Sequence, residues 1–195
     1  MTVLQYFHHL DQNLTLAVNS WSVPALDPVW QTFSAIKIWY PMYALVAAFI
    51  IWRLGWKKGG IVILSCILTV VCCDQLSNFT KAAVQRLRPC WDGNMLTGGL
   101  RILEDKGGLY GFYSSHAANT LGFALCTYWG LKNDSRLKYR GYAAVFCSWA
   151  FLVGISRVFV GKHFLGDVFV GFAAGVFFAW IMAKAADLLI RKLGL

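Results

Sequence analysis

The sequence predicts an all-α integral membrane protein, organised as one domain over residues 1–195. Of its 195 residues, 58% are hydrophobic and only 14% are charged, whereas a soluble domain carries about 25% charged residues. The formal net charge of +9 would suit a nucleic-acid-binding protein, but not one with long apolar runs. The hydrophobicity also excludes a disordered chain. We therefore expect a helical bundle in a bilayer, with no nucleic-acid partner.

The N-terminal segment, residues 1–35, predicts an amphipathic helix that lies at the membrane interface. Apolar side chains recur at steps of three and four residues, and polar side chains occupy the other face. Such helices lie in the interface plane, and Pro24 and Pro28 break the pattern before a second short piece at 29–33. A sixth, atypical span through this segment is the alternative. The apolar positions are Val3, Leu4, Phe7, Leu10, Leu14, Val18 and Trp21, and the polar ones are Asp11, Gln12 and Asn13.

Five apolar stretches follow, at 36–54, 60–79, 117–131, 141–160 and 164–190. A spanning helix needs about 20 apolar residues, within a range of about 17–25. The third stretch, from His116 to Leu131, is short, and we expect polar residues that line the protein interior to extend it. The sequence therefore predicts five spanning helices.

Five spans fix which loops share a side of the membrane. Residues 53–59, 132–140 and the C-terminus lie on one side, and the N-terminal segment, 80–115 and 161–163 lie on the other. Cytoplasmic loops carry an excess of Lys and Arg, so the first side, with the larger number, is expected to be cytoplasmic. Its members are Arg53, Lys57, Lys58, Lys132, Arg136, Lys138, Arg140, Lys184, Arg191 and Lys192, against Lys37, Lys81, Arg86, Arg88, Arg101, Lys106, Arg157 and Lys162 on the second side.

Ionisable groups at the ends of the predicted spans are candidates for function, because charges are costly there. Lys81 and Arg88 are seven residues apart, about two helical turns, so they share a helix face. Pro89 then ends the helix. A basic helix end whose side chains reach the interface is the alternative. Arg86 falls on a different face, and we expect it to be solvated.

A second group, Tyr113-Ser114-Ser115-His116, comes directly before the third stretch. The free N–H groups and the dipole of a helix start favour a bound phosphate, although serines at this position also act simply as N-caps.

The third group bridges the fourth and fifth stretches and contains Arg157, His163 and Asp167. Because His163 and Asp167 are four residues apart at a helix start, Asp167 can accept one ring N–H of His163. The other ring nitrogen is then free to act as a nucleophile or a base. All three groups lie on one membrane face, and together they predict a site for a phosphoryl group. One histidine can attack phosphorus while the other protonates the leaving oxygen.

At these residues the sequence resembles the type 2 phosphatidic acid phosphatase (PAP2) superfamily, whose motifs are K-x6-R-P, P-S-G-H and S-R-x5-H-x3-D. The first motif is matched in spacing and the third in full, and the order of spans extends the resemblance to nearly the whole chain. The matching residues are Lys81, Arg88 and Pro89 for the first motif, and Ser156, Arg157, His163 and Asp167 for the third.

The resemblance implies that His163 is the nucleophile, that Asp167 sets its tautomer, and that His116 is the general acid and then the base that activates water. It implies no metal and no cofactor, and the six cysteines and four histidines show no metal-ligand spacing. The residues implied to bind the phosphate are Lys81, Arg88, Ser114, Arg157 and the backbone N–H of Ser115.

The second motif departs from the family pattern, because Tyr113 replaces the proline and Ser115 the glycine. A turn that required a positive φ would strain Ser115. Tyr113 is expected at the pocket mouth, where it would shape substrate choice. Residues 90–112 form a glycine-containing loop over the site, either a mobile lid or an ordered connector. In it, Arg101 and Lys106 are candidates for a second phosphate or are solvated charges.

The implied activity is metal-independent hydrolysis of a lipid phosphomonoester or diphosphate through a phosphohistidine, at the non-cytoplasmic leaflet. The substrates within reach are lipid A, undecaprenyl pyrophosphate, phosphatidylglycerol phosphate and phosphatidic acid. A short one-domain chain suggests a bacterial inner membrane, with the site facing the periplasm or the outside. The alternatives are a non-enzymatic bundle that moves anions or lipids, for which the His163–Asp167 pair would not matter, and a vanadate-dependent haloperoxidase, which membrane embedding disfavours.

Overall fold

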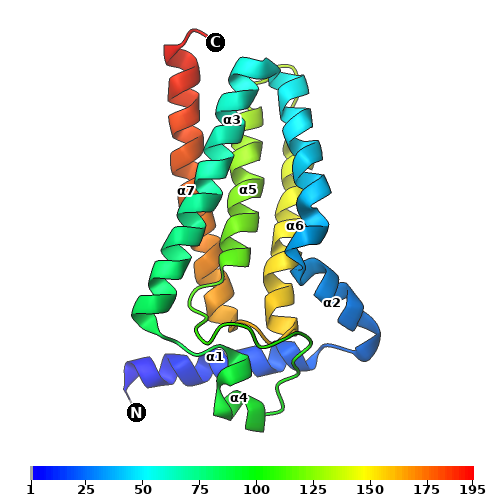
Figure 1. Ribbon diagram of the computed structural model, residues 1–195, viewed down its shortest axis with the longest axis vertical. Helices are drawn as coiled ribbons and strands as arrows, with labels where there is room; N and C mark the ends of the chain where they lie inside the picture. The colour runs from blue at the N-terminus through cyan, green and yellow to red at the C-terminus, as the bar shows by residue number, and fades with distance from the viewer. Residues whose placement is uncertain (1) are drawn as a thin grey trace.

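The computed structural model describes residues 2–195, and every regular element in that part of the chain is helical (Figure 1). The prediction of an all-α protein is therefore confirmed. The β-type pairing among these residues is one isolated bridge, between Leu87 and Tyr110. In chain order the elements are α1 (Val3–Ser20), η1 (Pro24–Leu26), α2 (Asp27–Ser34), η2 (Ile36–Trp39), α3 (Tyr40–Val84), η3 (Pro89–Trp91), α4 (Gly93–Thr97), α5 (Ser115–Leu131), α6 (Arg140–Phe159) and α7 (Leu165–Lys192).

Helix α3 is a hairpin of two arms that run in opposite directions (Figure 1). The residues on both sides of Gly55 are helical, while Gly55 itself has a φ of 75° and a ψ of 169°. Glycine reaches a positive φ because it has no Cβ. The expectation of a loop over residues 53–59 is wrong, because the chain reverses its direction at Gly55 alone. The two arms correspond to the first two apolar stretches of the sequence.

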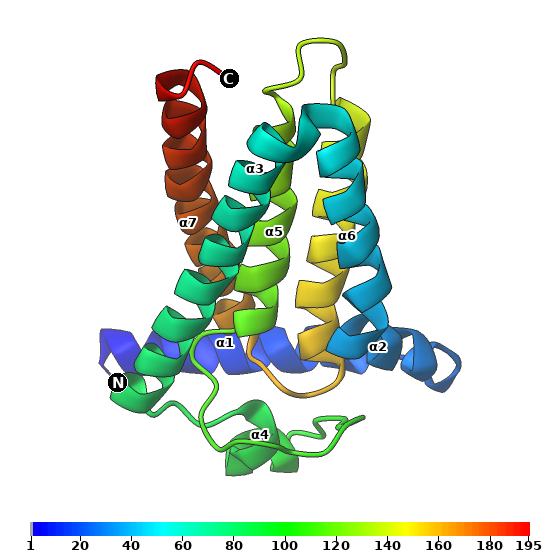
Figure 2. The ribbon, with the colours of Figure 1, turned by 45° about the horizontal axis from the view of Figure 1, so that its top comes forward.

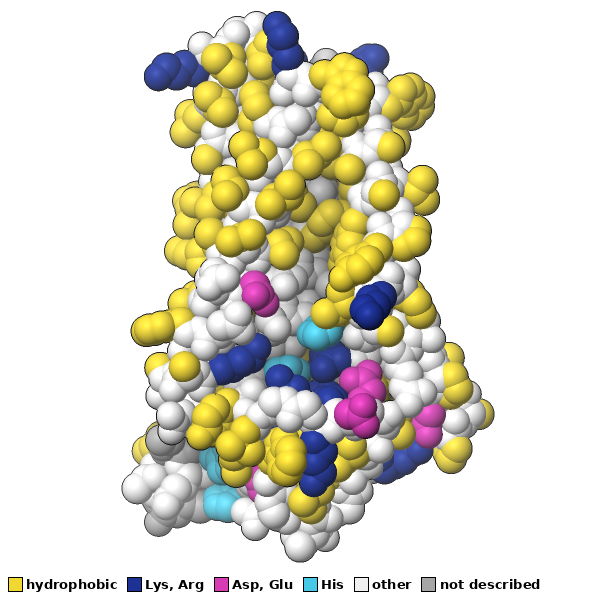
Figure 3. All heavy atoms as spheres, viewed as in Figure 1, with side chains coloured by type: hydrophobic (Ala, Val, Ile, Leu, Met, Phe, Trp, Pro, Cys, Tyr) yellow, Lys and Arg dark blue, Asp and Glu magenta, His cyan; other side chains and the backbone are white. Residues whose placement is uncertain are grey.

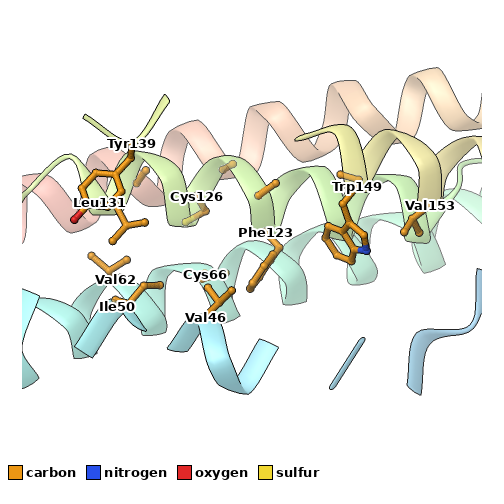
Figure 4. Close-up of a cluster of buried hydrophobic side chains, with 14 of the residues drawn as sticks. Val46, Ile50, Val62, Cys66, Phe123, Cys126, Leu131, Tyr139, Trp149 and Val153 are labelled. Atoms are coloured by element: carbon orange, nitrogen blue, oxygen red, sulfur yellow. The ribbon is translucent and has the colours of Figure 1, made fainter. Parts of the chain in front are cut away.

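Helix α5 occupies the centre of the bundle and packs against α3, α6 and α7, as Figures 1 and 2 show. The largest buried apolar cluster lies around it and includes Ile50, Val62, Phe123 and Trp149 (Figure 4). Because neighbours surround α5, its 17 residues can include polar ones. Thr127, for example, is buried and donates to the carbonyl of Phe123 one turn earlier at 2.8 Å.

Small residues bring α5 and α7 close together. A Cβ on Gly175 of α7 would lie 2.5 Å from the carbonyl oxygen of Ala118 on α5, so no larger side chain fits there without a shift. Close backbone approach through small residues is a common packing mode of membrane helices. At the lower end of this contact, the N–H of Ser114 donates to the carbonyl of Asp167 at 3.0 Å. The starts of α5 and α7 are therefore fixed side by side.

Three helical segments are long and apolar enough to cross a membrane, namely Ile36–Val84, Arg140–Phe159 and Leu165–Lys192. The first includes both arms of α3, and α5 is not among the three. Large apolar side chains also cover the outer surface of the bundle (Figure 3), whereas soluble proteins rarely expose large contiguous apolar patches. The five spans expected from the sequence stay a prediction.

Helix α1 lies crosswise below the bundle (Figures 1 and 2). It turns its polar face towards the protein. Thr15 and Asn19 are buried, whereas Phe7 is 60% and Leu14 is 46% exposed. This is the reverse of a surface helix in a soluble protein, whose apolar face is the buried one. The helix ends at Ser20, before the two prolines that were expected to end it.

The polar face of α1 binds backbone groups at the turn between α6 and α7. The amide of Asn19 donates to the carbonyls of Val158 and Phe159 at 3.0 and 3.1 Å. Thr15 accepts the N–H of Leu165 at 2.9 Å, the first residue of α7. Helix termini leave such groups without a partner inside the helix, so α1 anchors the turn that carries His163.

Candidate active site

Four helix ends meet at the lower end of the bundle in Figure 1, where α3 and α6 end and α5 and α7 begin. Figure 3 shows basic and histidine side chains gathered there, at the foot of a hollow in the surface. The residues that the sequence predicts for the site all lie at or near these four ends. They are Lys81, Arg88, Ser114, Ser115, His116, Arg157, His163 and Asp167.

His163 lies in the turn between α6 and α7 and is 2% exposed. Its backbone N–H donates to the carbonyl of Arg157 at 3.1 Å, which holds the turn against the last turn of α6. Its Nδ1 lies 3.4 Å from Oδ2 of Asp167, a long contact for a hydrogen bond. The second ring nitrogen, Nε2, is left for a ligand.

The electrostatic surroundings keep the imidazole of His163 neutral. Burial, and then the positive charges of Arg157, Arg88 and Lys81, hold the pKa of His163 well below its ordinary value. At neutral pH the ring therefore carries a lone pair on one nitrogen. A neutral imidazole is the form that a nucleophile or a general base requires.

Asp167 is held more firmly by Arg86 than by the histidine. Nη1 of Arg86 donates to Oδ1 of Asp167 at 2.9 Å, and Nη2 donates to Oδ2 of Asp11 in α1 at 2.7 Å. The guanidinium also stacks on the ring of Phe164, 3.9 Å from its centroid. The expectation that Arg86 is solvated is wrong. No local signal could have revealed these contacts, because the two carboxylates lie 81 and 75 residues away in the sequence.

The start of α5 contributes two serines with different roles. The hydroxyl of Ser114, which is fully buried, accepts the N–H of Ala117 at 3.5 Å and so caps the helix. Ser115 is the first residue of α5 and its Oγ accepts from Nζ of Lys81 at 3.4 Å. Ser115 is not among the residues with positive φ, so its replacement of the family's glycine causes no strain of that kind. His116 follows in the first turn of α5.

Tyr113 does not lie at the pocket mouth. It is 2% exposed, and its hydroxyl donates to the carbonyl of Cys73 in α3 at 3.0 Å. The expectation from the sequence is therefore wrong. The ring packs between α3 and α5 because the hydroxyl finds a backbone acceptor there, as buried tyrosines usually do.

The basic residues are positioned by three different parts of the chain. Lys81 comes from the last turn of α3 and Arg157 from the last turn of α6. Arg88 follows α3 in an extended segment, where its N–H donates to the carbonyl of Leu109 and its Nε to that of Tyr110. Only tertiary packing brings these three cations to one place.

Arg157 is 5% exposed, and its guanidinium has partners from two other segments. Its Nη1 hydrogen-bonds to Ser34 Oγ of α2 and lies 3.4 Å from a carboxylate oxygen of Glu104. Its Nε is buried without a partner in the part of the chain that the structure describes. An unsatisfied donor of this kind calls for an acceptor such as a ligand oxygen.

The loop over 90–112 closes the lower side of the site through its pairing with Arg88. Two of its charged residues lie elsewhere. Arg101 donates to Asp27 at 2.7 Å and to the carbonyl of Ser22, so its role is to fix α2. Lys106 lies 4.6 Å above the ring of Trp91. The side chains of Arg101 and Lys106 make no contact with Lys81, Arg88 or Arg157 in this structure.

An apolar groove of about 600 Å³ leads to the site between the two arms of α3 and α5. Ser115 and His116 lie at its polar end, together with Asp74 and Asn119. Figure 3 shows this groove as the hollow above the basic cluster. Such a shape suits a ligand with an apolar body and one anionic end. The groove walls also include Tyr40, Tyr43, Val46, Ile50, Ile63, Cys66, Ile67, Val70 and Phe123.

Within residues 2–195 no group of three or more His, Cys, Asp or Glu side chains is arranged to hold a metal ion. The six cysteines are free, and four of them, Cys66, Cys73, Cys90 and Cys126, are buried. The cysteines therefore pack as small apolar residues.

Comparison with known proteins identifies relatives over most of the chain. A lipid A 4'-phosphatase of Bacteroides thetaiotaomicron is 29% identical over 98% of this chain and 83% of its own length. A lipid A 4'-phosphatase of Porphyromonas gingivalis is 30% identical over 89% of this chain and 71% of its own.

The same fold occurs in a solved structure, the transmembrane PAP2-type phosphatidylglycerolphosphate phosphatase of Bacillus subtilis. The two superpose with a TM-score of 0.71 at 21% identity, over 95% of this chain and 88% of that one. This likeness shows a shared fold, and the long apolar helices make the protein an integral membrane protein.

The family model of the PAP2 superfamily matches residues 58–191, a range that contains both histidines, Asp167 and the three cations. Since that range is more than half of the sequence and its relatives extend to the N-terminal helices, the chain belongs to the PAP2 superfamily and is a membrane lipid phosphatase.

Proposed function

We propose that this phosphatase removes the 4'-phosphate of lipid A by way of a phosphohistidine on His163. The observation that carries the proposal is the apolar groove of about 600 Å³ whose polar end is Ser115 and His116. Acyl chains would lie in the groove and a phosphate would lie among the cations below it. The two bacterial relatives named lipid A 4'-phosphatase support this substrate.

The reaction follows from the two histidines. Nε2 of His163 attacks phosphorus, and the P–O bond to the lipid breaks while His116 donates its proton to the leaving oxygen. His116 then takes a proton from water, and the hydroxide attacks phosphorus. The P–N bond breaks, its electron pair returns to His163, and inorganic phosphate leaves.

The cations hold the phosphoryl oxygens as negative charge builds up on them. Lys81, Arg88 and Arg157 supply donors from three segments, and the N–H of Ser115 supplies the positive end of a helix. Ser114 supports the turn through its cap of α5. Asp167, fixed by Arg86, keeps the ring of His163 oriented.

We propose five spans, formed by the two arms of α3, α5, α6 and α7, in a bacterial inner membrane. The site, α1 and the loop over 90–112 would face the periplasm, and α1 would place Phe7 and Leu14 in the interface. An impermeant maleimide should then label Lys106→Cys but not Lys57→Cys in cells with a permeable outer membrane. Labelling of Lys57→Cys alone would reverse the orientation.

A phosphate-release assay on the purified protein tests the activity. The panel contains bis-phosphorylated lipid A, undecaprenyl pyrophosphate, phosphatidylglycerol phosphate and phosphatidic acid, each with and without EDTA, and with His163→Ala as the control. We expect lipid A to be hydrolysed fastest, with fragmentation of the product by mass spectrometry locating the loss at the 4' position. Faster turnover of another lipid would reject the substrate, and loss of activity in EDTA would reject the mechanism.

A further inference from the structure

Lys162 is a buried cation that the family motifs leave unassigned. It precedes His163 in the turn between α6 and α7, and only 6% of the residue is exposed. Burial is the main reason that its pKa is lowered from the ordinary lysine value. The position lies among the five unspecified residues of the third motif, so neither spacing nor resemblance singled it out.

The ammonium of Lys162 has no hydrogen-bond or ion-pair partner among residues 2–195. The groups that face it are Arg88 from the segment after α3, Arg157 from α6, and Glu104 and Cys90 from the loop. Glu104 is the one carboxylate of this set, and its contact is with Arg157 at 3.4 Å. The side chain of Lys162 is largely buried, although its ammonium is not among the fully buried unpartnered atoms. The like charges of Arg88 and Arg157 repel it and outnumber the one carboxylate, so an additional anion would stabilise this arrangement.

The loop brings its backbone against the same cation at Gly107. A Cβ on Gly107 would lie 3.4 Å from Nζ of Lys162 and 3.5 Å from Nη1 of Arg88. The φ of Gly107 is +63°, a conformation that favours glycine. The two cations therefore flank one point of the loop, and the absence of a side chain there leaves the space between them open.

We propose that Lys162 is a further anion-binding residue of the site, which together with Arg88 holds the phosphate dianion of the substrate. This inference rests on the proposed phosphatase mechanism. With it, the site holds four cations, Lys81, Arg88, Arg157 and Lys162, whose excess charge matches a monoester dianion better than a diester monoanion. The lysine costs stability in the free protein and contributes when the anion binds.

Inhibition of phosphate release by orthovanadate, a phosphate analogue, tests the proposal on the purified protein. Lys162→Met keeps the length of the side chain and removes its charge, whereas Lys162→Arg keeps the charge. We expect Lys162→Met to weaken vanadate inhibition at least tenfold and to raise the melting temperature of the free protein. Lys162→Arg should stay within about threefold of wild type. Lys106→Met, at the lysine over Trp91, is the matched control and should change neither quantity.

Two results would overturn the proposal. Vanadate inhibition of Lys162→Met that equals wild type would show that the ammonium does not meet the anion. A Lys162→Met protein that melts earlier or does not fold would show that the lysine stabilises the free protein. A wild type that neither binds vanadate nor releases phosphate would instead reject the proposed function as a whole.

Discussion

Both ends of the bundle gather arginine side chains, and the end around Gly55 and residues 132–139 pairs two of them, Arg53 and Arg136, with one carboxylate. Nη2 of Arg53 lies 2.6 Å and Nε of Arg136 2.8 Å from the carboxylate of Asp134. Tyr139 donates to the same carboxylate at 2.6 Å and accepts from Arg53. The hydrogen bonds from Arg136 and then Tyr139 hold the pKa of Asp134 far below its usual range.

At the opposite end, the positive charge is not balanced. The cations there face Glu104, which contacts Arg157 at 3.4 Å, while Asp167 is already paired with Arg86. Lys162 has no such partner within the described residues. The difference teaches that basic residues at a membrane protein's ends serve two purposes. Paired ones fasten helices together, and under-compensated ones fit the anion site that we propose.

Of the substitutions that distinguish the two ends of the bundle, the one at His163 should have the largest effect. His163→Ala should lower phosphate release by about 10⁴-fold or more, because loss of a covalent nucleophile removes the whole pathway. The melting temperature should fall by a few degrees, because the fully buried ring is truncated. Initial rates of phosphate release and thermal unfolding, measured on the same preparation, check the two expectations. Retention of full phosphate release would reject His163 as the nucleophile.

Arg86 offers the next largest effect, because it orients the site without touching the phosphate. Arg86→Met should reduce kcat by about 100-fold, as a misplaced His163 would, with KM nearly unchanged and partial recovery in Arg86→Lys. Its loss leaves two carboxylates, Asp11 and Asp167, without their shared cation, so the melting temperature should also fall.

The matched control for this arginine is Arg101→Met. Arg101 also pairs with an aspartate, Asp27, but away from the histidines. Its loss should lower stability while kcat stays within about twofold. Equal losses of kcat in both variants would remove the positioning role of Arg86.

The pH dependence of kcat/KM tests whether the unbalanced positive charge at this end acts on His163. Since its folded pKa is lowered, the neutral ring persists as the pH falls through about 6.5, the ordinary imidazole value. The acid limb of kcat/KM should therefore lie below that value. Arg157→Gln removes a nearby positive charge. The acid limb of this variant should therefore move to higher pH, even though the variant is slower than wild type. A wild-type limb above 6.5 would contradict the described electrostatics.

The smallest catalytic effect is expected at Asp134. Asp134→Asn should leave kcat unchanged and lower the melting temperature at pH 7. Because the folded pKa of Asp134 is depressed, its contribution is present above the unfolded value of about 3.9 and declines as the pH falls below it. Thermal unfolding from pH 7 to 3 should thus show a constant gap between variant and wild type above about pH 4, and a gap that begins to narrow below it. A gap that does not narrow at the acid end would mean that charge is not the cause.

Several parts of the fold and site could be predicted because they depend on short spacing. Hydropathy indicated the helices, although the exact reversal at Gly55 depends on one residue's φ of 75°. The four-residue gap from His163 to Asp167 correctly placed this pair at the start of α7. The expectation that Lys81 and Arg88 share a helix face up to Pro89 is wrong, because α3 ends at Val84 and Arg88 lies in an extended segment. The amphipathic pattern indicated α1 correctly as a helix.

What the sequence by itself determined is therefore the helical class, the membrane setting and the residue types that can hold and attack a phosphate, since these follow from composition and local periodicity. Only the tertiary structure decided that Arg86 contacts Asp167, that Tyr113 packs inward, that α1 turns its polar face to the protein and that Lys162 has no hydrogen-bond or ion-pair partner among residues 2–195. The physical reason is that these outcomes depend on groups 40 to 150 residues apart, which meet only when α1, α3, α5 and α7 pack.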